Sequence, residues 1–176
     1  MKTTLIWKKL IIDGKDIVRN RDLETMCQEL GKEYEYCRKY LLEQGYLHRV
    51  FRGVYYVKNP DEMERKYFKD SIYQIVAKGL RVKGVKNWYF GLETGLKLNN
   101  MTHEYFTINY VITDSYRTTK VIKIIDTQFF FLKWSPKIFK FGIIEKNGLK
   151  YSDREKTVLD LIYRSYYERK IWLYNT

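Results

Sequence analysis

The residues that could carry out acid–base or nucleophilic chemistry are scattered in this sequence. Its two histidines, His48 and His103, are far apart along the chain, and no pattern brings them together. The sequence also lacks the motifs of serine hydrolases, phosphate-binding loops, zinc proteases and dinucleotide-binding folds. We therefore predict that the protein is not an enzyme and that it uses no cofactor.

Three acidic residues, Asp153, Glu155 and Asp160, are candidates for metal ligands. They lie near the start of a predicted helix, where acidic side chains interact favourably with free amide groups. Ser152 and Glu155 also have the spacing of a capping box. We interpret these residues as structural and predict no metal site. Lys156 and Asp160, one helical turn apart, could form an ion pair.

The two cysteines, Cys27 and Cys37, fall on the apolar faces of predicted helices. Neither belongs to a CxxC pair or lies near a histidine cluster, so the sequence does not indicate a zinc site. We predict buried, reduced thiols, which fits an intracellular protein. No apolar run approaches the ~20 residues that a membrane span needs, and the N-terminus lacks the apolar region of a signal peptide. We expect a cytoplasmic protein without a membrane partner.

The composition favours binding of a polyanion. The chain has 176 residues, enough for one sizeable domain or two small ones, and a formal net charge of +12. Such a balance favours nucleic acid or an acidic membrane surface, although charge can also serve solubility alone.

Residues 32–57 predict a helix followed by a two-stranded hairpin. Tyr34, Cys37 and Leu41 recur at helical spacing, and Gly45 ends the helix. Strands are predicted on both sides of the turn Phe51-Arg52-Gly53, at 46–50 and 54–57. Upstream, the pattern predicts helices and a short strand at 4–12, 21–30 and 15–19. This order predicts a winged helix-turn-helix domain over residues 1–59, with the hairpin as the wing.

Basic and polar residues of this domain could contact DNA. Glu33, Glu35 and Glu43 on the third helix oppose this, because phosphate repels them unless they pair with Lys or Arg or read a cytosine amine. The wing has a simpler, basic character and favours DNA contact by Arg49 and Arg52, although the alternative is that both are solvated hairpin charges. The predicted DNA-binding residues are Arg21, Lys32, Tyr36, Arg38, Lys39, His48, Arg49, Arg52 and Lys58.

Residues 60–176 predict a second, mixed α/β domain, so the fold class is α+β. Asn59, Pro60 and Glu62 have the types and spacing of a helix start, and we expect a helix over 60–79 that bridges the two domains. The remaining elements predicted are helices over 87–98 and 152–167 and strands over 105–113, 120–125, 129–134 and 139–145. These strands predict a four- to five-stranded sheet.

Three segments carry a resemblance to a known family. They are LLEQGYL with RVFRGVY within 41–55, WYFGLETGL at 88–96 and YSDREKTVLDLIY at 151–163. In this order they resemble the AbiEi family of antitoxins from type IV toxin–antitoxin systems. The resemblance implies an N-terminal winged helix that binds inverted repeats in its own promoter. It also implies a C-terminal antitoxin domain that counters a nucleotidyltransferase-like toxin encoded beside it.

In that family, positive surface on the C-terminal domain is implicated in both duties. The cations that are similar in kind here, and that we predict as an antitoxin surface, are Arg117, Lys120, Lys123, Lys133, Lys137 and Lys140. Two alternatives stay open. The chain could be a protein-interaction module whose winged helix is only a scaffold, or an RNA-binding protein that uses its tyrosines and positive charge. We make no prediction of oligomeric state.

Overall fold

The computed structural model describes the backbone of residues 4–174 and the side chains of residues 4–166. The architecture is α+β, and the chain divides into two compact units between Gly84 and Val85. The sequence placed the boundary at residue 59, so 25 residues assigned to the second domain (60–84) belong to the first unit.

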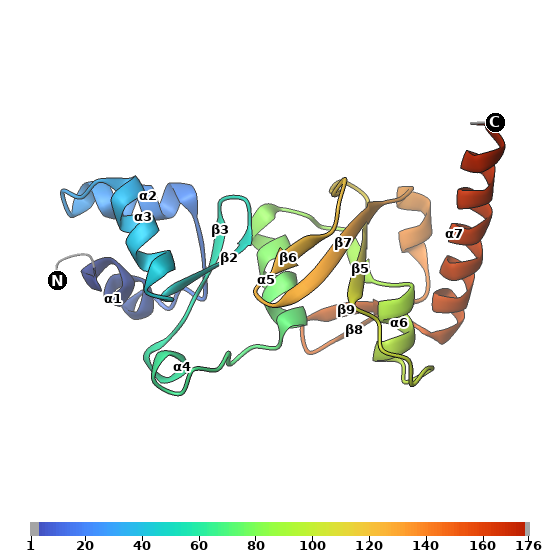
Figure 1. Cartoon of the computed structure of the whole chain (residues 1–176), viewed down its shortest axis with the longest axis horizontal. Coiled ribbons are helices and arrows are strands. Elements are labelled where there is room, and N and C mark those ends of the chain that lie inside the picture. The colour runs from blue at the N-terminus through green and yellow to red at the C-terminus, as the bar shows by residue number, and fades with distance from the viewer. Residues whose placement is uncertain (1–3, 175–176) are drawn as a thin grey trace. The chain divides into compact units, whose positions relative to one another are not determined.

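The first unit contains a three-stranded antiparallel sheet with helices on both faces (Figure 1). Its strands, in the order β1-β3-β2, are β1 (Ile17–Arg19), β2 (Leu47–Phe51) and β3 (Val54–Val57). The helices on one face are α1 (Thr4–Ile12), α2 (Asn20–Glu29) and α3 (Tyr34–Glu43). Apolar side chains of these helices, including Leu10, Cys27 and Leu41, form one core with Val18 and Tyr55 of the sheet. The expected helices, short strand and hairpin are therefore present, and both cysteines are buried free thiols.

The single helix expected over 60–79 is wrong. The structure has α4 (Pro60–Glu64) and α5 (Ile72–Lys83), each with its own start signal. The predicted capping box between Asn59 and Glu62 is confirmed, with backbone amides and side-chain oxygens paired at 2.8 and 2.9 Å. A second capping box, between Ser71 and Gln74, starts α5. Because each box satisfies free amides at a new helix start, the chain forms two helices here instead of one.

Gly79, predicted to end a helix, lies inside α5. A Cβ atom at this position would lie 2.8 Å from Phe51 and 2.9 Å from Val50, so only glycine permits this approach of α5 to the hairpin. The helix ends instead at Gly84. Since α5 covers the second face of the β1-β3-β2 sheet, it is a structural part of the first unit.

The second unit is built on a six-stranded mixed sheet, where the sequence predicted four to five strands. The strand order is β6-β7-β5-β4-β9-β8, in which the β5–β7 and β4–β9 pairs are parallel and the others antiparallel. The strands are β4 (Trp88–Phe90), β5 (Ile108–Thr113), β6 (Ile122–Ile124), β7 (Thr127–Lys133), β8 (Ile143–Lys146) and β9 (Leu149–Ser152). The helices are α6 (Glu93–Leu98), the short 3-10 helix η1 (Pro136–Lys140) and α7 (Arg154–Tyr174).

Two predicted elements of this unit are wrong, and one strand was not predicted. The helix expected over 87–98 begins with β4, because three successive buried aromatic residues are favoured in a strand. The strand expected over 139–145 begins with the end of η1, and only its later part forms β8. The strand β9, which lies between the strand predicted over 139–145 and the helix predicted over 152–167, was missed.

Candidate nucleic-acid interface

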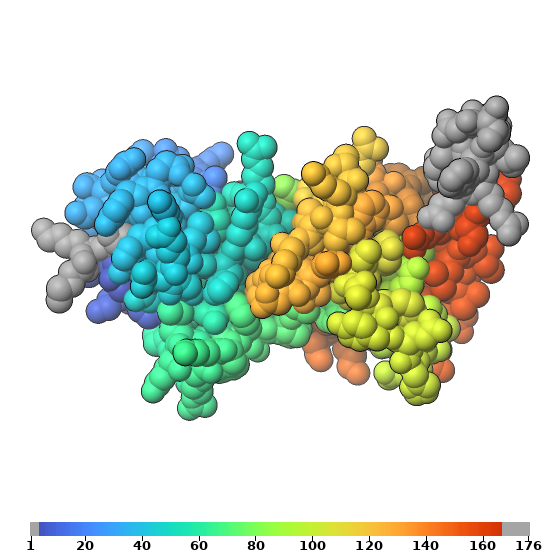
Figure 2. Space-filling model, in the orientation of Figure 1, coloured from blue at the N-terminus to red at the C-terminus, as the bar shows by residue number. Residues whose placement is uncertain are grey.

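The hairpin of β2 and β3 places two arginines at the surface. Arg49 lies opposite Tyr55 in the strand ladder, and Arg52 occupies the turn. Both side chains are exposed, and neither forms an ion pair with any residue of the described chain. Gly53 has a φ of +73°, a conformation that L side chains rarely adopt, so this glycine allows the tight turn. Figure 2 shows the hairpin turn, in turquoise, projecting from the surface of the first unit.

Two further arginines flank this turn. The backbone amide of Asn20 donates to the carbonyl of Gly53 at 2.9 Å, which ties the end of β1 and the start of α2 to the hairpin. Arg19 and Arg21, on either side of Asn20, are both exposed. Arg21 was predicted, but Arg19 was missed. The only signal for Arg19 in the sequence was that it is a basic residue at the end of the short predicted strand. The pairing of that strand with β3 places Arg19 beside the hairpin turn.

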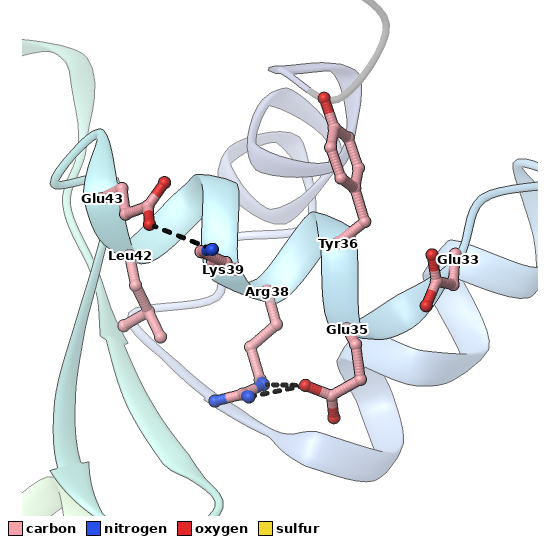
Figure 3. A pocket seen from close by; sticks show the side chains of 7 residues that line it. All are labelled: Glu33, Glu35, Tyr36, Arg38, Lys39, Leu42 and Glu43. Carbon is pink, nitrogen blue, oxygen red and sulfur yellow. Dashed lines mark hydrogen bonds and ion pairs between the residues drawn. The ribbon is translucent and has the colours of Figure 1, made fainter.

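The outer face of α3 differs from the hairpin because its charges are paired with one another. Arg38 donates to Glu35 at 2.6 Å, and the ammonium of Lys39 lies 3.9 Å from the carboxylate of Glu43 (Figure 3). These residues, with Tyr36, line a shallow depression of about 480 Å³. For Glu35 and Glu43, the pairing fits one exception stated from the sequence, that these glutamates would be compatible with DNA if they paired with Lys or Arg.

Arg38 also interacts with Tyr55 of the sheet. Its pKa is raised above the ordinary value, first by the hydrogen bond to Glu35 and then by one to Tyr55. The neighbouring Tyr34 has its pKa raised to about 12, chiefly because burial disfavours the phenolate. These contacts fix the Arg38 side chain against the protein. Of the other two residues predicted in this region, Lys32 lies just before α3 and is half-buried, and Tyr36 lies on α3 and is exposed.

Two predicted DNA-binding residues do not lie on an open surface. Lys58 is only 8% exposed, and its ammonium lies 4.1 Å from the centre of the Phe68 ring. A lysine at the end of a hairpin normally reaches solvent, but here the segment between α4 and α5 covers it. His48 is half-buried, with its ring edge-on to Phe68 at 4.9 Å. We therefore remove Lys58 from the candidate interface, and His48 contributes at most its exposed edge.

In the second unit, all the cations predicted as an antitoxin surface are exposed. Residues 115–140 contain six basic side chains and one acidic side chain, Asp126, which lies 3.3 Å from Lys123. Hydrogen bonds between Thr118 and Phe131 hold the segment before β6 alongside β7, which brings Arg117 toward the end of that strand. This segment, yellow to orange in Figure 2, lies at the surface of the second unit.

The segment of the AbiEi resemblance at 151–163 forms a buried polar network. The ammonium of Lys156 donates to the Ile138 carbonyl at 2.8 Å and to Asp160 at 3.3 Å, which confirms the predicted Lys156–Asp160 pair. Tyr89 donates to the other oxygen of Asp160 at 2.9 Å. Burial raises the pKa of Asp160 above its ordinary value, and Lys156 and Tyr89 partly oppose that rise. Because the network is closed and desolvated, its role in this structure is to hold the unit together.

The predicted capping box of Ser152 and Glu155 is wrong by one residue. Asp153 caps α7, accepting from the amide of Lys156 at 2.7 Å. Ser152 ends β9, and its hydroxyl lies 2.6 Å from the hydroxyl of Thr157. The cap lies one residue later than expected because Ser152 completes the strand. Among the described residues, no group of three His, Cys, Asp or Glu side chains could hold a metal ion.

No helix in the described part of the chain has the length and apolar character needed to cross a bilayer. Comparison with protein-family models gives no match to this sequence. A search of curated proteins likewise finds no significantly similar sequence.

Proposed function

We propose that this chain is a non-enzymatic, DNA-binding transcriptional regulator whose first unit acts as a winged helix-turn-helix domain. The succession of α2, α3 and a hairpin that follows directly supports this assignment. The observation that carries it is the pair of exposed arginines on that hairpin, Arg49 and Arg52, which form no ion pair with any residue that the structure describes. Arginine at a wing commonly follows the phosphate backbone or enters the minor groove. Such a regulator acts in the cytoplasm.

The net charge of +12 supports a polyanionic partner for the whole chain. Neutralised phosphates release counterions, so the affinity for DNA falls steeply as salt concentration rises. The test is an electrophoretic shift assay at low and at moderate salt on the DNA upstream of the gene. The AbiEi resemblance implies inverted repeats in that DNA. We expect tighter binding to this DNA than to random duplex of equal length. Equal binding to both, or no binding at low salt, would contradict a regulatory role.

We propose further that the chain is the antitoxin of a type IV toxin–antitoxin system. This proposal rests on the AbiEi resemblance, and it is supported by the concentration of exposed cations over residues 115–140. The test is expression of the nucleotidyltransferase-like gene that the resemblance predicts beside this one, with and without this chain. We expect growth arrest without it and restored growth with it. Arrest in both cultures would remove the antitoxin role and leave the regulator role standing.

A protein-interaction module is the second candidate, favoured by a specific observation on α7. Val158, Leu159 and Ile162 are 44%, 52% and 60% exposed, respectively, which is unusual for neighbouring apolar side chains of one helix. Co-purification with the neighbouring gene product together with absent DNA binding would select this function. Preferential binding of single-stranded RNA over duplex DNA would instead select an RNA-binding role.

A further inference from the structure

The first unit has two groups of exposed cations that differ in their electrostatic state. The segment 32–43, which contains α3, carries three basic and three acidic side chains, so its formal charge is zero. Two of its cations, Arg38 and Lys39, are in ion pairs with the glutamates of the same helix. A phosphate that approached this face would have to compete with those carboxylates for each cation.

The second group consists of Arg19, Arg21, Arg49 and Arg52, which we call the hairpin arginines. All four are exposed, and within residues 4–166 none is in an ion pair. Their guanidinium groups are therefore available to an external anion. The acidic residue closest in sequence to any hairpin arginine is Asp22, which follows Arg21 and is half-buried.

Backbone contacts bring three of the hairpin arginines, Arg19, Arg21 and Arg52, to one end of the three-stranded sheet. Arg19 lies opposite Val54 in the β1–β3 ladder, one residue from the turn. A Cβ atom at Gly53 would be only 3.2 Å from the side-chain nitrogen of Asn20. The turn that carries Arg52 therefore touches the residue between Arg19 and Arg21. Arg19 and Arg21 therefore lie beside the turn that carries Arg52, although both are more than 30 residues from Arg52 in the sequence.

We propose that the hairpin arginines supply the DNA affinity of the first unit and that α3 supplies little of it. This inference rests on the proposed DNA-binding function and specifies which surface performs it. Guanidinium groups bind phosphate oxygens in a fixed, bidentate geometry, and unpaired ones do so without first breaking an internal pair. The ligand is the phosphate backbone of duplex DNA.

The first variant to test is Arg19→Gln/Arg52→Gln, which removes two hairpin arginines. Its matched control is Lys8→Gln/Lys66→Gln, which removes two exposed cations elsewhere in the first unit that pair with no described side chain. Binding to labelled duplex from the gene's upstream region is titrated over a range of salt concentrations. We expect the hairpin variant to lose roughly tenfold or more in affinity and its salt slope to fall by about 2, since each lost phosphate contact removes about 0.9. The control should stay within about threefold of wild type.

The second variant removes the α3 ion pairs without a change of net charge: Glu35→Gln, Arg38→Gln, Lys39→Gln and Glu43→Gln together. We expect its affinity to stay within about threefold of wild type, with an unchanged salt slope, because the removed charges cancel. Circular dichroism melting curves establish that each variant is folded.

Each result has a defined meaning. A loss of about tenfold or more in the α3 variant, or a hairpin variant that matches the lysine control, would overturn the inference while leaving DNA binding intact. If the wild-type protein binds no duplex at low salt, the proposed function itself fails and the inference fails with it. A further substitution, Glu35→Gln alone, should raise affinity, because it frees Arg38 from its carboxylate partner.

Discussion

Replacing Lys156 with methionine tests the interpretation of the 151–163 segment as structural. The Lys156 and Asp160 side chains are 1% and 6% exposed, so the substitution leaves a buried carboxylate whose remaining hydrogen-bond donor among the described side chains is Tyr89. It also leaves the Ile138 carbonyl without the ammonium that donates to it. Removing one member of a buried pair costs roughly 3–5 kcal/mol, and we expect a loss of that size in the free energy of unfolding. Urea denaturation followed by circular dichroism measures it.

The pH dependence of this loss follows from the pKa of Asp160. Burial raises that pKa above its ordinary value of 3.8, and Lys156 lowers it in part. A carboxyl whose pKa is raised on folding stabilises the protein most below the unfolded value, and this contribution is lost as pH rises through the folded value. Without Lys156 the pKa of Asp160 in the folded protein rises further. The pH range over which a protonated Asp160 stabilises the fold therefore extends further upward from 3.8. We therefore expect Lys156→Met to be less destabilising at about pH 5 than at about pH 8.

A double variant separates the effect of the uncompensated charge from that of lost packing. Asp160→Asn keeps the size of the side chain and can still accept from Tyr89. In the Lys156→Met background it should recover roughly 0.5–3 kcal/mol, because no buried charge remains. The interpretation would be refuted if Lys156→Met unfolded like wild type at both pH values, or if adding Asp160→Asn made that variant still less stable.

Three further predictions concern the first unit. Leu41→Ala should lower the free energy of unfolding by roughly 2–5 kcal/mol, because Leu41 is 0% exposed in the core; a melting curve equal to wild type would contradict this. Gly79→Ala should also lower thermal stability, since a Cβ would lie 2.8 Å from Phe51, and an unchanged melting temperature would show that α5 can shift freely. The Cys27 thiol, whose pKa burial raises to about 12, should react with Ellman's reagent at about pH 8 only after denaturation, whereas rapid reaction of the native protein would contradict its burial.

The helices and the hairpin of the first unit could be predicted from local signals. Apolar residues at helical spacing marked α2 and α3, and the turn glycine marked the hairpin. The extent of the unit could not be predicted in this way. The position of α5 against β2 depends on the fit of Gly79 to Val50 and Phe51, which is a contact between distant residues.

The second unit was harder because its missed strands are short and lack alternation. All three residues of β4 are buried, so its pattern does not distinguish a strand from a helix. A signal for β9 was present, however. Asn147 and Gly148 both have positive φ in the turn that joins β8 to β9, and an Asn-Gly pair between two short runs is a strong hairpin signal.

The candidate site shows the same division between local and distant effects. The ion pairs of α3 join residues three and four apart, so they could be anticipated from spacing. The burial of Lys58 under Phe68 could not, since it depends on how the segment between α4 and α5 folds back. Arg19 gains its position beside the turn only through the pairing of β1 with β3.

Site-directed cross-linking from the hairpin turn tests the central claim most directly. In an Arg52→Cys variant, a thiol-reactive photo-crosslinker should attach selectively to the new cysteine, since both native thiols are buried. The matched control carries the same group on Lys8→Cys, an exposed position of α1. We predict that irradiation with duplex from the gene's upstream region cross-links position 52 to DNA far more efficiently than position 8. Equal efficiency at the two positions, or cross-linking from position 8 alone, would contradict DNA binding by the hairpin.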